Sequence, residues 1–168
     1  MNTVSIYSAR VARLISVGLF CSIMIAGALT AQVPAVEADY YKIQTLPIPE
    51  GVVLEVGGLE ILPDGQLGVS TRRGEVWLIK NPYMTGGVRP QFKRFAHGLH
   101  EALGLAYRDG AFYTSQRSEL TRLRDNDGDG RADLYETVYS WPLEGNYHEY
   151  SFGPLIRDDG TMIVTLNL

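Results

Sequence analysis

The sequence predicts an all-β protein organised as part of a β-propeller, a ring of similar four-stranded sheets called blades. Two observations predict this fold. First, a short apolar segment, an Asp-Gly pair and a second apolar segment follow one another three times, with the pairs beginning at residues 64, 109 and 159. The repeat period is therefore 45 to 50 residues. Second, helical periodicity is nearly absent after residue 40.

Each copy of the repeat is expected to form a β-hairpin. The copies are GLEILPDGQLGVS (58–70), GLAYRDGAFYTS (104–115) and GPLIRDDGTMIVTLNL (153–168). Asp and Gly tolerate the positive φ that a tight hairpin turn needs, so each Asp-Gly pair predicts a turn between two strands.

The first two copies continue alike, which completes a blade in each case. A polar turn with arginine leads into another alternating segment at Thr71–Ile79 and again at Gln116–Leu123. Further strands are expected at Gln91–Ala96 and Leu134–Tyr139, so each repeat holds about four short strands, as a propeller blade does. The alternative is a meandering sandwich whose hairpins share turn chemistry. The near-constant period and the repeated arginine favour the propeller.

The third copy stops after two strands. Propellers need four to eight blades to close. Residues 39–168 are therefore expected to be the N-terminal part of a longer propeller, truncated at its C-terminus, with about three blades. An open arc would expose strand edges and an apolar blade face.

Residues 1–38 are expected to be a secretory signal peptide with a helical apolar run. Arg10 and Arg13 precede the uncharged segment at 14–30, and Val36-Glu37-Ala38 offers small residues at the −3 and −1 cleavage positions, with Ala26-Gly27-Ala28 as a second option. An uncleaved membrane anchor is the alternative, because 17 residues is at the short limit for crossing a bilayer. The predicted location is periplasmic or secreted, with membrane attachment only if the segment is uncleaved.

Composition narrows the classes of partner. The apolar fraction of 45% and the 18 glycines are typical of a globular, turn-rich chain. The formal net charge of −4 and the lack of a basic run argue against nucleic acid. Cys21 is the only cysteine, which excludes an intramolecular disulfide and a cysteine-based zinc site.

The most specific motif is an acidic loop, DNDGDGRADLYE, at 125–136. It fits the twelve-residue calcium loop, with carboxylates at positions 1, 3, 5, 9 and 12 and glycine at position 6. Strands are expected on both sides, so the motif predicts a structural Ca²⁺ loop between blade strands; the alternative is a solvated acidic turn. The expected metal residues are Asp125, Asp127, Asp129, Arg131, Asp133 and Glu136.

A His-Glu dipeptide stands before the leading strand of two successive repeats, as His100-Glu101 and His148-Glu149. In a propeller, the loops that precede the innermost strands lie together at one end of the central channel. Both His-Glu pairs are therefore expected to face one pocket there. A neutral imidazole there can accept a proton near pH 7. Tyr147 and Tyr150 flank the second pair and could stack on a sugar or planar cofactor. A plain surface position, or zinc held by both histidines and a glutamate, is the alternative.

Three segments, 70–79, 95–137 and 145–168, resemble glucose/sorbosone dehydrogenase-like propellers, most closely the secreted members fused to haem-binding modules. The resemblance covers about residues 45–168. It implies a six-bladed propeller and a quinoprotein dehydrogenase that uses pyrroloquinoline quinone (PQQ) with Ca²⁺. It further implies a sugar or polyol substrate and a cytochrome c or haem module as electron acceptor. The acidic loop at 125–136 is not the quinone's calcium site in this resemblance.

The resemblance also implies a catalytic residue. His148 matches the family's general base, which removes the hydroxyl proton of the sugar while hydride leaves to the quinone. Tyr147 departs from the acidic residue that glucose-oxidising members carry before this histidine, so glucose itself is not implied. His100, Glu101, Tyr147 and Glu149 are the expected substrate-pocket residues, and the quinone-binding residues are unknown. The rival function is a non-catalytic propeller that binds carbohydrate or a partner protein.

Overall fold

The computed structural model describes residues 36–142 and 150–167, which belong to two units, one ending at Ile43 and one beginning at Gln44. In the first unit the described residues contain a single helical turn, α2 (Glu37–Tyr40). Nearly all of the expected signal peptide, 1–38, lies outside the described residues, so the signal peptide and its cleavage stay predictions. Within the described ranges, no helix is long and apolar enough to cross a membrane.

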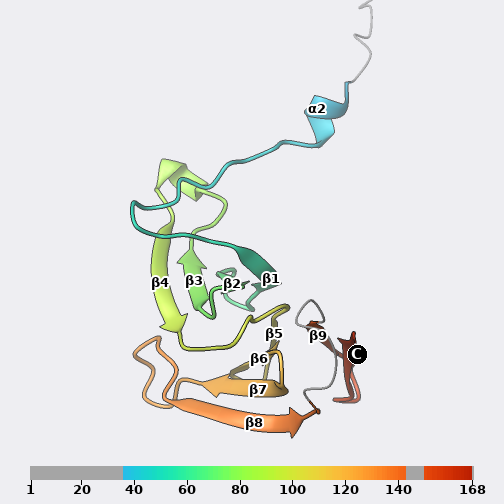
Figure 1. The fold of residues 1–168 in the computed structure, drawn as a ribbon. Coiled ribbons are helices and arrows are strands. Elements are labelled where there is room, and N and C mark those ends of the chain that lie inside the picture. Colours follow the sequence, from blue (N-terminus) through green and yellow to red (C-terminus); the bar gives the residue numbers. More distant parts are fainter. Residues whose placement is uncertain (1–35, 143–149, 168) are drawn as a thin grey trace, which may run out of the picture. The chain divides into compact units, whose positions relative to one another are not determined.

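The described residues of the second unit form three antiparallel sheets, with loops between them and one short 3₁₀ turn, η1 (Thr85–Gly87) (Figure 1). Strands that follow one another in the sequence are neighbours in each sheet. The first sheet contains β1 (Val56–Ile61), β2 (Leu67–Thr71), β3 (Val76–Lys80) and β4 (Gln91–Ala96). The second contains β5 (Ala106–Arg108), β6 (Ala111–Ser115), β7 (Glu119–Arg124) and β8 (Leu134–Ser140), and the third contains β9 (Ser151–Ile156) and β10 (Met162–Leu166). The all-β prediction is confirmed.

The three Asp-Gly hairpins are present but differ in their turns. Asp109 has a φ of 51°, so the β5–β6 hairpin closes through the left-handed conformation expected of a tight turn. Asp64 and Asp159 use their side chains instead. Oδ1 of Asp64 accepts a hydrogen bond from the Gln66 amide at 3.0 Å, and Oδ1 of Asp159 accepts one from the Thr161 amide at 2.9 Å. The dipeptide therefore predicts a hairpin in every repeat without determining its turn type.

Glycines at matching places in the repeats bring the leading segments together. A Cβ atom on Gly58 would lie 2.5 Å from the Gly104 carbonyl carbon, and one on Gly104 would lie 2.4 Å from the Gly153 carbonyl oxygen. Gly104 also has a φ of +109°, which side chains rarely adopt. The amide of Gly153 donates to the Leu103 carbonyl at 3.0 Å. Neighbouring repeats thus approach backbone to backbone at their leading strands.

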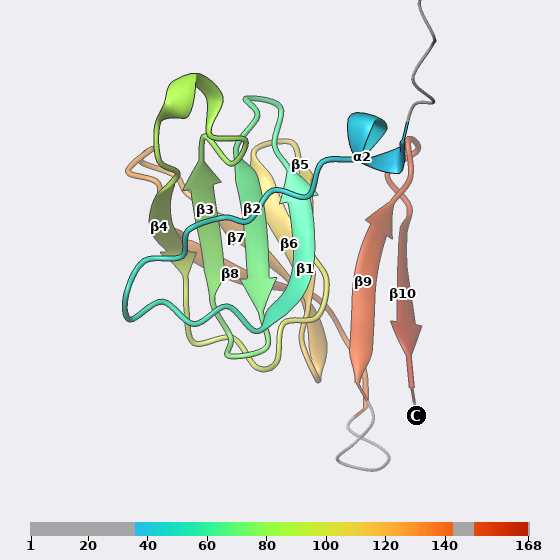
Figure 2. The ribbon, with the colours of Figure 1, turned by 90° about the horizontal axis from the view of Figure 1, so that it is seen from above.

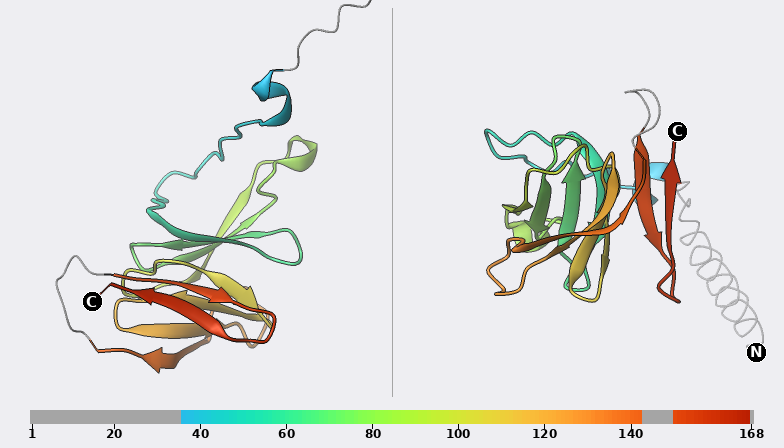
Figure 3. Two further views of the ribbon diagram at one scale, coloured as in Figure 1. Left: turned by 90° about the vertical axis from the view of Figure 1, so that its right-hand side faces the viewer. Right: turned by 60° about the horizontal axis from the view of Figure 1, so that its bottom comes forward.

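Two apolar clusters join the sheets through opposite faces of β6. Phe112 belongs to the cluster between the first and second sheets, whereas Ala111 and Tyr113 belong to the cluster between the second and third. Alternate residues of a strand point to opposite faces, so the second sheet packs on both sides. Figure 3 shows β9 and β10 beside the β5–β8 sheet.

The outer faces of the two end sheets are covered to different extents. The segment between Gln44 and Glu55 crosses the outer face of the first sheet (Figure 2), and Nε2 of Gln44 donates to the Tyr83 carbonyl at 2.9 Å. The outer face of β9–β10 instead carries exposed apolar side chains, among them Leu155 and Ile163. The three sheets do not close into a ring.

Candidate functional site

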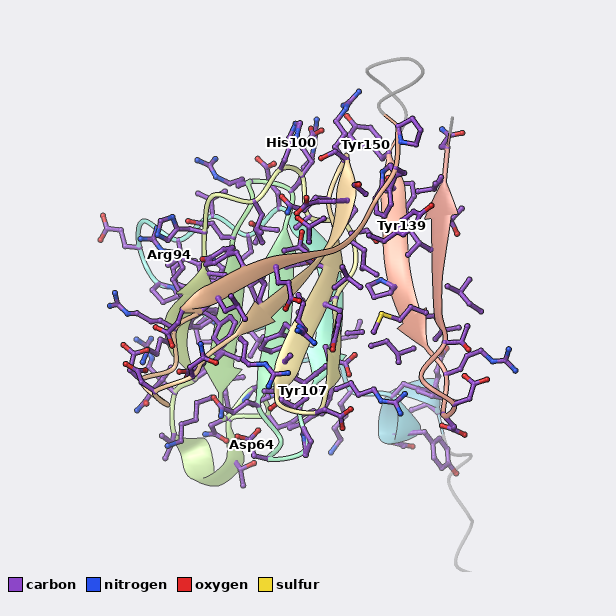
Figure 4. The ribbon with its side chains drawn as sticks, turned by 90° about the horizontal axis from the view of Figure 1, so that it is seen from below. Asp64, Arg94, His100, Tyr107, Tyr139 and Tyr150 are labelled. Atoms are coloured by element: carbon purple, nitrogen blue, oxygen red, sulfur yellow. The ribbon has the colours of Figure 1, made fainter. Side chains whose placement is uncertain are left out.

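Polar side chains from three consecutive repeats meet at one end of the strands. Two come from the turns that follow β2 and β6, one from the segment leading to β5, and one directly precedes β9. The four residues, called the mouth cluster, are Arg72, Arg117, Glu101 and Tyr150. Figure 4 shows His100 and Tyr150 at this end, with Asp64 at the opposite end of the strands.

Glu101 and Tyr150 each contact both arginines. Oε1 of Glu101 is 3.4 Å from Nη2 of Arg72, and Oε2 is 3.2 Å from Nη1 of Arg117. The Tyr150 hydroxyl is 3.3 Å from Nη2 of Arg72. Both guanidinium carbons also lie over the Tyr150 ring, 5.8 Å from its centroid for Arg72 and 5.4 Å for Arg117. One carboxylate and one aromatic ring therefore hold together two cations from different sheets.

Each arginine lies in the turn that follows the second strand of its sheet, although the two turns differ in length. The amide of Thr71 donates to the Glu75 carbonyl at 2.8 Å, and the amide of Gln116 donates to the Glu119 carbonyl at 2.7 Å. The arginine is the next residue in each turn. Glu101 has a φ of 50°, a left-handed conformation that is uncommon for a residue with a side chain and concentrates at constrained, functional positions.

The mouth cluster has more positive than negative charge. The side chains of Glu101 and Arg117 are 21% and 19% exposed, whereas Arg72 is 55% exposed. Tyr150, followed by Glu101, raises the pKa of the Arg72 guanidinium, so this arginine stays charged. Two guanidinium groups and one carboxylate leave one net positive charge among the four residues. This arrangement suits an anionic or electron-rich ligand.

Of the predicted pocket residues, His100 and Glu101 lie at this end of the strands. Nε2 of His100 is 4.0 Å from Oε2 of Glu101, and the imidazole is 63% exposed. Tyr147, His148 and Glu149 fall within 143–149, outside the described residues. Their pocket and general-base roles therefore stay predictions.

Arg72 and Arg117 are site residues that the sequence alone does not identify. The repeated turn with arginine was the available signal, because it occurs at matching places in two repeats. The repeat does not show, however, that the two turns lie close together in space. The convergence on Glu101 and Tyr150 is visible only once the sheets are packed.

Three of the predicted metal residues lie together in the loop between β7 and β8. One carboxylate oxygen from each of Asp125, Asp127 and Asp133 lies within 4.8 Å of the others. Ca²⁺ binds oxygens at about 2.3–2.6 Å, so two oxygens on one ion can be up to about 5 Å apart. The spacing is compatible with a shared ion.

Hydrogen bonds within the loop orient these carboxylates. Asp125 accepts hydrogen bonds from the amides of Gly128 and Gly130, each at 2.7 Å, and Asp133 accepts one from the Asn126 amide at 2.8 Å. Desolvation acts to raise the pKa of Asp125, but the amides of Gly130 and Gly128 outweigh it, and the net pKa lies below the ordinary value. The carboxylate therefore stays ionised at neutral pH.

Asp129 and Glu136 are placed differently from the three converging residues. Oδ1 of Asp129 accepts a hydrogen bond from the Arg131 amide at 2.7 Å. Glu136 lies in β8 opposite Arg122 of β7, with its Oε2 2.8 Å from Nε of Arg122. The carboxylate at the last position of the motif is therefore bound by a residue of the neighbouring strand. In an EF-hand, this end of the loop leads into a helix instead.

No protein-family model matches the chain, and no curated protein matches it. The resemblance to quinoprotein dehydrogenases therefore depends on the sequence motifs alone.

Proposed function

We propose that the three sheets are consecutive blades of a β-propeller, with the ring size of six taken from the family resemblance. Three features support this fold. The first two sheets have the same strand order, β1 to β4 and β5 to β8. The leading segments of neighbouring repeats contact each other through matching glycines, the first with the second and the second with the third. The central sheet packs on both faces, which a two-sheet sandwich does not require.

The proposed function is that of the N-terminal part of a periplasmic PQQ-dependent dehydrogenase acting on a sugar or related alcohol. The mouth cluster is the observation that supports it, because loops of successive repeats bring charged side chains to one end of the strands. Loops on a rigid scaffold are where propellers place their binding sites. A cytochrome c or haem module is the proposed electron acceptor.

His148 is the proposed general base, two residues before Tyr150 in the sequence. It would accept the hydroxyl proton of the substrate, with Glu149 or a backbone carbonyl orienting the ring. PQQ supplies a hydride acceptor when bound, and it is a planar anion. The guanidinium groups of Arg72 and Arg117 beside the Tyr150 ring fit such a group by charge and shape. His100, Glu101 and Tyr147 complete the proposed substrate pocket.

The proposal predicts a large effect of removing the base. In the full-length protein reconstituted with PQQ and Ca²⁺, His148→Ala should lower kcat by about 10²–10⁴-fold and leave quinone binding unchanged. His97→Ala is the matched control, because His97 contributes no side chain to the mouth cluster. Stopped-flow reduction of the quinone by a panel of sugars measures both variants. Equal small effects of the two substitutions would remove His148 from the mechanism.

A non-catalytic propeller that binds carbohydrate or a partner protein gives a different result in the same experiment. It would bind sugar in calorimetry without any quinone-dependent turnover, and His148→Ala would change affinity alone. This outcome would replace the dehydrogenase assignment.

We also propose that Ca²⁺ binds at Asp125, Asp127 and Asp133, in the β7–β8 loop. The convergence of three carboxylates supports this site. Loops of this kind outside cells bind with Kd of about 10⁻⁴–10⁻³ M. Ca²⁺ at tenfold its Kd should therefore stabilise the full chain by about 1.4 kcal/mol.

Two variants separate this site from an EF-hand-like one. Asp125→Asn combined with Asp133→Asn should abolish the binding heat and the thermal stabilisation by Ca²⁺. Glu136→Gln should retain binding within about threefold, because the Glu136 carboxylate pairs with Arg122. Absence of any calcium heat in the unaltered chain would show the loop to be a solvated acidic turn.

A further inference from the structure

A groove lies between β4 and the loop that joins β7 to β8, and it shares no residue with the mouth cluster. The amide of Ala132 donates to the Phe95 carbonyl at 2.8 Å, which attaches the loop to the strand. The groove has a volume of about 430 Å³, within the range of small-molecule sites. Cationic and aromatic side chains line it: Lys93, Arg94 and Arg131 with Trp77, Phe92 and Tyr135. We call it the rim groove.

The cations of the rim groove are only partly neutralised. Nη1 of Arg94 is 3.1 Å from Oε1 of Glu75. Nζ of Lys93 donates to the Asp129 carbonyl, which carries no formal charge. The Arg131 guanidinium makes no hydrogen bond or ion pair with residues in the described part of the chain. A ligand anion would supply the counter-charge that Lys93 and Arg131 lack.

The carboxylates of the neighbouring loop do not line this groove. Asp125 accepts hydrogen bonds from amides of its own loop, and Asp129 accepts one from the Arg131 amide. Arg131 lies in that loop, but its side chain lines the groove with β4. The acidic loop therefore presents a cation, and no carboxylate, to the cavity.

One carboxylate holds an aromatic ring and a cation side by side. Nε1 of Trp77 donates to Oε2 of Glu75 at 3.0 Å, and the same carboxylate binds Arg94. Trp77 and Arg94 are also direct partners across β3 and β4. The indole face and the guanidinium are thus oriented before any ligand arrives, which lowers the entropic cost of binding.

We propose that the rim groove binds a small cyclic carboxylate, a sugar acid or an aromatic acid, with its carboxylate on Arg131 and Lys93 and its ring against Trp77. A carboxylate matches the fork of a guanidinium. An aromatic ring can stack on an indole, and a sugar ring can place its apolar C–H face against one. The site does not depend on the proposed dehydrogenase function, because none of its residues belongs to the mouth cluster.

Calorimetry and tryptophan fluorescence on the full chain test this site with D-glucuronate and benzoate as probes. D-glucose supplies a ring without charge and acetate supplies charge without a ring, and both should bind at least about tenfold more weakly. The ligand should change the emission of the unaltered chain but not of Trp77→Phe, which retains Trp141. Glucuronate alone would identify a sugar acid, and benzoate alone would identify an aromatic acid.

Matched charge removals complete the test. Arg131→Gln should lower the affinity for the probe that binds by at least about tenfold. Arg89→Gln removes another exposed arginine, one that does not line the groove, and should change the affinity by less than about twofold. No binding of either probe, acetate bound as tightly as the cyclic acids, or equal effects of the two variants would each overturn the proposal.

Discussion

The interface between the first and second sheets is more complete than the one between the second and third, although the same repeat builds both. In the first interface, the Phe112 ring packs edge-on against Phe95 and Tyr107, with centroid distances of 5.1 Å and 4.9 Å. Nine buried apolar residues form its core. In the second interface, four buried residues of the β5–β8 side face side chains of β9 and β10 that are only partly buried.

The first interface also has the more complete hydrogen bonding of the two. Oγ of Ser70 donates to the Gly104 carbonyl at 3.2 Å, joined by Oγ1 of Thr114 at 2.6 Å. Ser115 occupies the matching place in the next repeat, yet its hydroxyl is buried and has no hydrogen-bond partner among the described residues. The third sheet has two strands where the others have four, and Tyr139 of β8 is 66% exposed. The repeat thus decides which residues face each other, and the number of packed strands decides how fully they are buried.

The largest expected effect comes from the centre of the first interface. Phe112→Ala should lower the free energy of unfolding by about 3–5 kcal/mol, because the ring is fully buried and its removal leaves a cavity. Ile156→Ala in the second interface should cost only about 1 kcal/mol, since that side chain is already partly exposed. Urea denaturation followed by circular dichroism measures both. Equal costs would show that the interfaces are equally complete.

A smaller effect is expected from the two matching serines. Ser70→Ala should lower the free energy of unfolding by about 1 kcal/mol, because it removes a hydrogen bond to a carbonyl. Ser115→Ala should cause no loss or a slight gain, because it removes a buried hydroxyl without a described partner. The same denaturation experiment ranks the pair. A larger loss for Ser115→Ala would mean that this hydroxyl makes a contact that Ser70 lacks.

The smallest effects are expected in the hairpin turns, which are local and should not distinguish the sheets. The side chain and amide of Gln66 lower the pKa of Asp64, and the amide and side chain of Thr161 lower the pKa of Asp159. A folded pKa below the unfolded value stabilises the protein above about pH 4, and this contribution is lost as the pH falls through the folded pKa.

Asp64→Asn and Asp159→Asn should therefore lower the melting temperature slightly and about equally at pH 7. The difference between each variant and the unaltered chain should shrink as the pH is lowered from 7 to about 2.5, because protonation of the carboxylates removes this contribution. Differential scanning calorimetry at both pH values measures the difference. A much larger effect at Asp64 alone would tie its turn to the more complete interface.

Much of the fold could be predicted because its signals are short-ranged. The strand expected at Gln91–Ala96 has exactly those bounds, and the one expected from Leu134 extends one residue further, to Ser140. Alternation along a strand acts between residues two apart, and an Asp-Gly turn acts within four residues. The turn type is less predictable, because the same dipeptide forms a side-chain hydrogen bond at Asp64 and adopts a positive φ at Asp109.

The candidate site could be predicted only in part. The dipeptide His100-Glu101 is predictable because it recurs before a leading strand, and Glu101 does lie at the mouth cluster. The acidic loop was found because its carboxylates follow a fixed spacing, and three of them converge. Glu136 satisfies that spacing as well, but the β7–β8 register pairs it with Arg122. A motif specifies residue types and their spacing. It does not show which residues of a neighbouring strand will bind its carboxylates in the folded protein.

By itself, the sequence determined the strands, the hairpins and the acidic loop, because each depends on the conformations of residues a few positions apart. Only the tertiary structure decided that Arg72 meets Glu101, 29 positions away, and Tyr150, 78 positions away. The tertiary structure likewise brings Trp77 and Arg94 to the same carboxylate, that of Glu75, beside a groove. These contacts depend on how sheets stack and which strand faces are covered, and packing of that kind is a property of the whole folded unit.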